Sequence, residues 1–165
     1  MLATTSKYNP RALRGFLFAG IALLLASCGT MGTKLQPPAA SIQQLSVNSD
    51  GSWTATVRFQ NFSYDTGMHV YAIDATLSLG GKTAGKVAFA PSLDIPEMDA
   101  DVATVTLKPD PAAAAALAAA HAHSIQYALK GTLSVGKGQR GSAQSFPLDG
   151  KGYISPVPGV SNIWR

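Results

Sequence analysis

Two histidines lie two residues apart and are the side chains in this sequence best suited to holding a metal ion. His121 and His123 would face the same side of a strand, because successive side chains of a strand alternate between its faces. His69, elsewhere in the chain, could join them through the fold. The competing interpretation places both at the C-terminal end of a helix, where imidazole suits the helix dipole. Zinc sites typically use three or four ligands, so we assign no metal site and no cofactor.

A second group of polar residues is acidic and consists of Asp94, Glu97, Asp99 and Asp101. Carboxylates at this density could bind Ca²⁺ or work as an acid–base pair. Their spacing does not match a known calcium loop, and Ile95-Pro96 interrupts it. A solvated loop explains the cluster better.

Nucleophilic catalysis and phosphate binding have no matching motif. No serine occupies a Gly-x-Ser-x-Gly elbow, and the three histidines do not support a catalytic triad. The glycine-rich stretch 136–141 lacks the spacing and the Lys-Ser/Thr ending of a phosphate loop, and a hairpin turn explains it better. We therefore expect no catalytic residue and no enzymatic activity.

Cys28 is the only cysteine, and its surroundings predict covalent lipidation. Lys7, Arg11 and Arg14 precede an uncharged stretch at 15–26 with the length of a signal-peptide core, shorter than the roughly 20 apolar residues of a membrane span. Leu25-Ala26-Ser27-Cys28 looks like a bacterial lipobox, in which the thiol accepts a lipid. The competing interpretation is an incidental free thiol, which an oxidising compartment disfavours. Gly29 in place of Asp favours the periplasmic leaflet of the outer membrane.

The basic character of the chain belongs mostly to this leader. The whole sequence has 13 basic and 9 acidic residues; without the leader, ten basic residues stand against the same nine acidic ones. The remaining charges are mixed in sign, so nucleic acid is not an expected partner. The expected partners are the membrane, through the lipid, and envelope proteins or stress-exposed proteins.

The elements that must position these side chains follow from the periodicity of the apolar residues. We expect a lipoprotein signal peptide at 1–27, the lipidated cysteine with a flexible tether at 28–38, a β-sandwich at 39–155 and a C-terminal tail at 156–165. Alternation of apolar and polar residues is clearest in Trp53, Ala55, Val57 and Phe59. Another set on one strand face is Tyr71, Ile73, Ala75, Leu77 and Leu79. The expected strands span about 42–47, 53–59, 70–79, 83–89, 102–107, 125–135 and 143–154.

About seven strands without intervening helices predict an immunoglobulin- or fibronectin III-like antiparallel β-sandwich. One short alanine-rich helix interrupts the strands at 112–120. Asp110 would cap it and Pro111 would occupy its first position, so the helix would close one end of the sandwich. The competing interpretation is a low-complexity linker. The apolar Ile163-Trp164 in the tail would either dock on its own domain or bind a partner.

The order of these motifs resembles the late embryogenesis abundant (LEA) type 2 family, whose unit is the water-stress and hypersensitive-response (WHy) domain. The resemblance covers residues 38–154 and rests on short stretches: VYAIDATLSLGGK at 70–82, Ile95-Pro96, and IQYALKGTL at 125–133. The family's Asn-Pro-Asn turn is replaced here by Asn61-Phe62-Ser63. The resemblance implies a fibronectin-like sandwich and an association with desiccation stress, and it brings no catalytic residues.

Three functions follow as expectations. The first is a non-enzymatic, membrane-anchored lipoprotein that protects the cell envelope during desiccation or other stress. The second is an accessory interaction module of an envelope protein complex that uses a sheet edge or the tail. The third is a periplasmic lipoprotein that binds a small ligand or a metal through His69, His121 and His123.

Overall fold

The computed structural model describes residues 34–165 of the chain. The predicted signal peptide, the predicted lipidation site Cys28 and most of the predicted tether lie outside the described residues. Among residues 34–165, no helix has both the length and the apolar character needed to cross a membrane.

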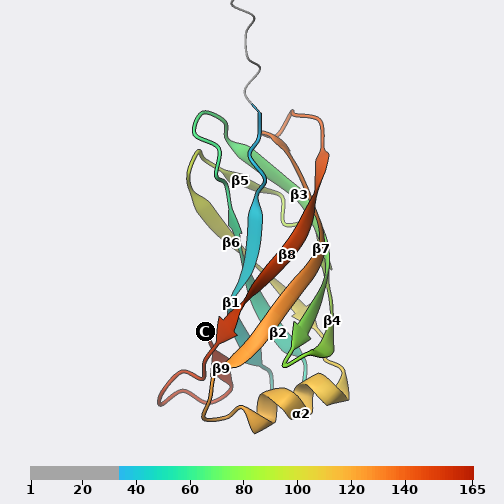
Figure 1. Cartoon of the computed structure of the whole chain (residues 1–165), viewed down its shortest axis with the longest axis vertical. Helices are drawn as coiled ribbons and strands as arrows, with labels where there is room; N and C mark the ends of the chain where they lie inside the picture. Colours follow the sequence, from blue (N-terminus) through green and yellow to red (C-terminus); the bar gives the residue numbers. More distant parts are fainter. Residues whose placement is uncertain (1–33) are drawn as a thin grey trace, which may run out of the picture. The chain divides into compact units, whose positions relative to one another are not determined.

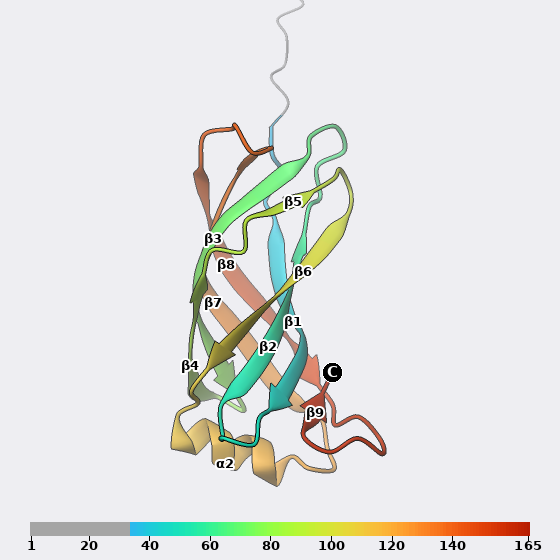
Figure 2. The ribbon, with the colours of Figure 1, turned by 180° about the vertical axis from the view of Figure 1, so that it is seen from behind.

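The described part is a β-sandwich with one helix across an end (Figures 1 and 2). Its elements, in chain order, are β1 (Ala39–Val47), β2 (Trp53–Gln60), β3 (Met68–Leu79), β4 (Lys82–Phe89), β5 (Leu93–Ile95), β6 (Ala100–Leu107), α2 (Pro111–Ala119), β7 (Ile125–Lys137), β8 (Gln144–Ile154) and β9 (Ile163–Trp164). The expected sandwich and its short helix are confirmed. The helix lies where the expectation placed it, across one end of the two sheets (Figure 2).

Two antiparallel sheets form the layers. One has the order β6-β2-β1-β9, and the other has the order β4-β3-β7-β8 with β5 also paired to β3. The burial pattern of strand β2 shows why the layers pack. Trp53, Ala55, Val57 and Phe59 are all buried, while the residues between them are more exposed. Burial of one face of each sheet supplies the main driving force for this arrangement.

The two sheets also approach each other closely along one side, where β8 passes β1. A Cβ atom added to Gly150 of β8 would lie 2.6 Å from the backbone oxygen of Ala40 in β1. On the same side, the backbone N–H of Ile42 donates a hydrogen bond to the hydroxyl of Tyr127 in β7, at 3.3 Å. The backbone of β1 therefore helps to close the sandwich on this side.

Register shifts in the strands interrupt the simple alternation that the sequence suggests. In β3, the pairing with β7 shifts between Val70 and Ala72, so Val70 and Ile73, three residues apart, are both buried. Tyr71 was expected on the buried face and is instead only half-buried, because this bulge moves it off that face. A similar shift in β1 between Ile42 and Gln44 lets Ile42 and Leu45 share the core.

The described residues contain two strands that the sequence analysis did not predict, so the sandwich has nine strands rather than about seven. Strand β5 lies within the acidic stretch that was interpreted as a loop, and it pairs with the start of β3. Strand β9 belongs to the C-terminal tail and pairs with β1, which places Leu45 opposite Trp164. Both strands are too short to show a periodic pattern.

Helix α2 begins with Pro111 at its first position, as expected. Asp110 occupies the N-cap position, but its side chain makes no capping hydrogen bond. The backbone carbonyl of Asp110 instead accepts hydrogen bonds from Ala113 and Ala114, which satisfies amides that a side chain would otherwise serve. The expected side-chain cap is therefore wrong. Leu117 enters the open end of the sandwich and is 2% exposed.

Candidate functional site

The structure separates the three histidines that could have formed a metal site. His69 lies on β3 opposite Asp94 of β5, whereas His121 and His123 follow helix α2 at the other end of the sandwich. Within residues 34–165, no group of three or more His, Cys, Asp or Glu side chains could hold a metal ion.

His69 forms the most organised polar cluster of the described residues. Its Nδ1 atom lies 2.7 Å from Oδ1 of Asp94, and its ring packs edge-on against Tyr71 with centroids 4.6 Å apart. The side-chain amide of Gln139 donates to the other carboxylate oxygen of Asp94. These hydrogen bonds, from Gln139 first and His69 second, hold the pKa of Asp94 below its ordinary value of 3.8. An ionised carboxylate only accepts, so Nδ1 of His69 carries the proton.

This cluster holds elements together. His69 and Tyr71 belong to β3, Asp94 belongs to β5, and Gln139 belongs to the β7–β8 loop. The Tyr71 hydroxyl donates to the carbonyl of Gly141 at 2.6 Å, so it ties β3 to the β7–β8 loop. The Tyr71 ring lies so close to Gly136 that an added Cβ would approach it to 2.8 Å. The glycine-rich stretch 136–141 thus packs against β3 as the end of a hairpin.

The other acidic side chains are exposed and bond locally. Asp99 and Asp101 each accept a hydrogen bond from the backbone N–H of the following residue, at 2.7 Å. Glu97 is exposed as well. Of the four acidic residues singled out in the sequence, the structure gives only Asp94 side-chain partners from other elements.

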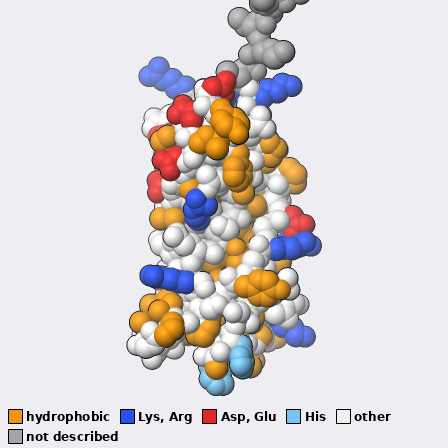
Figure 3. All heavy atoms as spheres, turned by 60° about the vertical axis from the view of Figure 1, so that its left-hand side comes forward, with side chains coloured by type: hydrophobic (Ala, Val, Ile, Leu, Met, Phe, Trp, Pro, Cys, Tyr) orange, Lys and Arg blue, Asp and Glu red, His pale blue; other side chains and the backbone are white. Residues whose placement is uncertain are grey.

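The end of the sandwich at which residues 34–38 lead into β1 carries an apolar patch, which we call the entry-end patch and which consists of Phe62, Tyr64 and Met98. These side chains are 44%, 81% and 49% exposed. The backbone N–H of Met98 donates to the carbonyl of Ser63, which places the two loops together. The Ser63 hydroxyl accepts from the backbone of Gln36, so the entering chain lies beside them. Figure 3 shows hydrophobic side chains at this end next to acidic and basic ones.

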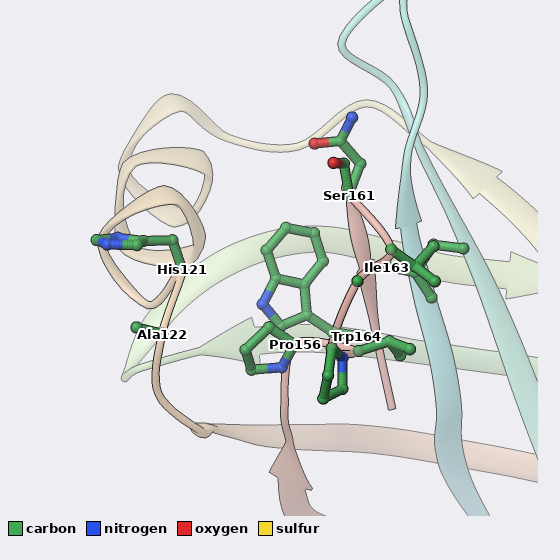
Figure 4. A pocket seen from close by; sticks show the side chains of 11 residues that line it. His121, Ala122, Pro156, Ser161, Ile163 and Trp164 are labelled. Atoms are coloured by element: carbon green, nitrogen blue, oxygen red, sulfur yellow. The ribbon is translucent and has the colours of Figure 1, made fainter.

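The opposite end carries a groove between helix α2 and the C-terminal segment, which we call the helix-end groove. It consists of two hollows with volumes of about 680 and 390 Å³. Both are lined by His121, Asn162 and Trp164, and Figure 4 shows the larger hollow with His121 and Trp164 labelled. Trp164 is 7% exposed, so the indole docks on its own domain. Its Nε1 atom is buried and has no hydrogen-bond partner among the described residues.

Neither the entry-end patch nor the helix-end groove was predicted as a site. The exposed Phe62 and Tyr64 follow a strand directly, and nothing in the sequence distinguishes an exposed aromatic residue from a buried one there. The groove depends on the tail folding back beside α2, which brings together residues more than forty positions apart. Trp164 and His121 were each singled out, but no spacing signal linked them.

The sequence matches no family model and no curated protein. Solved structures do resemble the fold. AT1g01470 from Arabidopsis thaliana aligns over 82% of this chain and 93% of its own, with a TM-score of 0.52 and 16% identity. At2g46140.1, described as a putative LEA protein, aligns over 90% of this chain and 86% of its own, with a TM-score of 0.46 and 17% identity. At the level of fold, the resemblance to the LEA type 2 family drawn from the sequence is confirmed.

Proposed function

We propose that this protein is a non-enzymatic lipoprotein of the bacterial cell envelope, in which a LEA-type domain protects the envelope during desiccation or related stress. Lipid on Cys28 would anchor the domain, by default at the periplasmic face of the outer membrane. More than one acyl chain at that residue would make the attachment firm.

The observation that carries the proposal is the position of the entry-end patch. Phe62, Tyr64 and Met98 are exposed on the end of the sandwich at which the chain enters the domain. Lys34 lies six positions after Cys28, and even fully extended this stretch spans only about 20 Å. A lipid on Cys28 would therefore hold this end of the domain close to the bilayer.

The chemistry of the patch suits the boundary between lipid and water. Tyrosine and other amphipathic aromatic side chains favour the level of the lipid headgroups. The surrounding charges include Asp65, Glu97 and Asp99 as well as Lys34 and Arg140. Because both signs are present, contact with lipid would depend on the apolar side chains rather than on attraction to anionic headgroups. A domain seated in this way would lie over the headgroup region.

The proposal is tested by survival after drying of a deletion strain complemented with the wild-type protein or with one of three variants. Wild-type protein is expected to restore survival, and Cys28→Ala is expected to fail. The double variant Phe62→Ser, Tyr64→Ser is expected to restore survival only in part, since the lipid anchor remains. Tyr153→Ser is the matched control, because Tyr153 is 68% exposed on β8 away from the patch.

Equal survival of all strains, including the deletion strain, would refute the protective role. Full rescue by Cys28→Ala would show that protection does not depend on membrane anchoring. Equal rescue by the patch variant and by Tyr153→Ser would show that the entry-end patch does not contribute.

A further inference from the structure

The helix-end groove has an unpaired hydrogen-bond donor in its wall. Trp164 is more than nine-tenths buried, and its Nε1–H has no partner among residues 34–165. Buried donors are nearly always paired, because an unpaired one loses its hydration without compensation. Figure 4 shows the nitrogen-bearing edge of the indole on the side of His121 and Ala122, which also line the groove. Because the nitrogen itself is covered in this structure, an acceptor oxygen on a bound molecule would satisfy this donor after a local rearrangement that uncovers it.

Helix α2 borders the groove with alanine side chains. Ala114 and Ala118 line the smaller hollow, and their short side chains leave its space unfilled. The helix has no charged residue on any side, and Ala115 and Ala118 are exposed. Helices that are apolar all round are normally covered. The side of α2 that carries Ala114 and Ala118 therefore borders the groove as an apolar surface.

The residues lining the two hollows exclude most ligand classes. No Asp, Glu, Lys or Arg is among them, so a charged ligand would lose its hydration without gaining a partner. The polar side chains are hydrogen-bonding groups: the Ser161 hydroxyl, the Asn162 amide and the His121 imidazole. An acyl chain would leave the indole N–H unpaired. A polypeptide, in contrast, alternates carbonyl acceptors and amide donors with apolar side chains.

We propose that the helix-end groove binds an uncharged, apolar segment of polypeptide. A backbone carbonyl of that segment accepts the hydrogen bond from Nε1 of Trp164, and its apolar side chains occupy the hollows beside Ala114 and Ala118. The combined size of the hollows is of the order of known ligand sites, which span about 300–1,000 Å³. This site is independent of lipid anchoring and of protection during drying.

The test measures binding of labelled, end-blocked dodecapeptides to the full-length protein in phosphatidylcholine nanodiscs. One peptide set contains only Leu, Val, Pro, Ala and Ser, and the second set carries Asp or Lys at two positions. We expect the uncharged set to bind. The charged set should bind at least about fivefold more weakly, because its charges would be buried without partners. In an NMR spectrum of isotopically labelled tryptophan, the Trp164 indole N–H resonance should shift on binding.

Variants locate the site. Ala118→Glu places a carboxylate in the groove and should abolish binding, whereas Ala115→Glu, on the exposed face but outside the lining, should retain it. Trp164→Phe keeps the ring without the donor and should weaken binding about fivefold. The proposal is overturned if neither peptide set binds, if charged peptides bind as well as uncharged ones, or if Ala118→Glu and Ala115→Glu behave alike. An indole resonance that does not move on binding would also overturn it.

Discussion

The side-chain amide of Asn61 reaches backbone groups of two loops at the entry end. Its Nδ2 donates to the carbonyls of Thr66 and Pro96, both at 2.9 Å, and its Oδ1 accepts from the backbone N–H of Ser63 at 2.9 Å. Asn61 is fully buried. One side chain thus takes over the hydrogen bonds that a regular turn would supply, at the point where the family's Asn-Pro-Asn motif is missing. The entry-end patch depends on this arrangement, because Phe62, Tyr64 and Met98 belong to the same two loops.

We predict that Asn61→Ala lowers the free energy of unfolding by about 2–3 kcal/mol, because it leaves buried backbone groups unpaired. The measurement is urea denaturation followed by circular dichroism. The neighbouring variant Gln60→Ala is the control: Gln60 makes a single exposed bond to Asp99, so its effect should stay within about 0.5 kcal/mol. Similar effects of the two variants would contradict the role given to Asn61.

A second prediction at this scale concerns pH and Asp94. The pKa of this carboxyl is lowered in the folded protein by the hydrogen bonds from Gln139 and His69. A lowered folded pKa contributes stability that is present above the ordinary value of 3.8 and is lost as the pH falls through the folded pKa. We therefore expect Asp94→Asn to destabilise the protein above pH 3.8 and to lose less stability on acidification than wild type does. Thermal midpoints across this pH range measure the effect, and parallel curves for the two proteins would contradict it.

At the scale of elements, the side-by-side run of β1 and β8 decides how tightly the two sheets close. Gly150 allows that approach, because the space a Cβ would need is taken by the backbone oxygen of Ala40. Backbone atoms on a paired strand have little freedom to move away.

We predict that Gly150→Ala costs about 1–3 kcal/mol of stability, as expected for overpacking. Gly67→Ala is the matched control. A Cβ there would meet its nearest neighbour at an ordinary 3.7 Å, so this change should be neutral or slightly stabilising by restricting the unfolded chain. Chemical denaturation of both variants is the measurement, and equal stability would show that β1 and β8 can separate without cost.

The sequence predicted the long elements because each is set by its own periodicity. The alternation in β2 and the Asp110-Pro111 start of α2 are local signals, and both placed their elements correctly. Bulges are not local in this sense: the misplacement of Tyr71 results from the pairing of β3 with β7. The short strands β5 and β9 exist because partners far along the chain offer hydrogen bonds, and the helix-end groove depends on β9. No residue pattern within those segments shows this.

At the scale of the whole domain, the two surfaces lie at opposite ends. Gln36 bonds to Ser63 at one end, whereas Trp164 pairs with Leu45 at the other. A domain tethered at Cys28 would therefore present the helix-end groove away from the bilayer.

This arrangement predicts an effect of tether length. A photo-crosslinking amino acid at position 64 should label lipid in the anchored protein, and one at position 153 should not. Insertion of a long glycine-serine segment between Thr33 and Lys34 should lower labelling at position 64 severalfold, because the effective concentration of a tethered group falls with linker length. Mass spectrometry of the lipid adducts is the measurement. Unchanged labelling would mean that the patch binds lipid without help from the tether, and equal labelling at both positions would mean that it does not face lipid.

Strand β1 leads from the entry end to the segment that carries Trp164, and this has a mechanical consequence. The chain enters β1 at Ala39, and Leu45, near the other end of the strand, pairs with the segment that carries Trp164. A load between a lipid anchor and a molecule held in the groove would run along the axis of β1. The backbone hydrogen bonds to β2 lie across that direction, so they would be sheared together rather than peeled apart one at a time. Strand β1 would thus bear tension between the anchor and the groove as the envelope shrinks and swells.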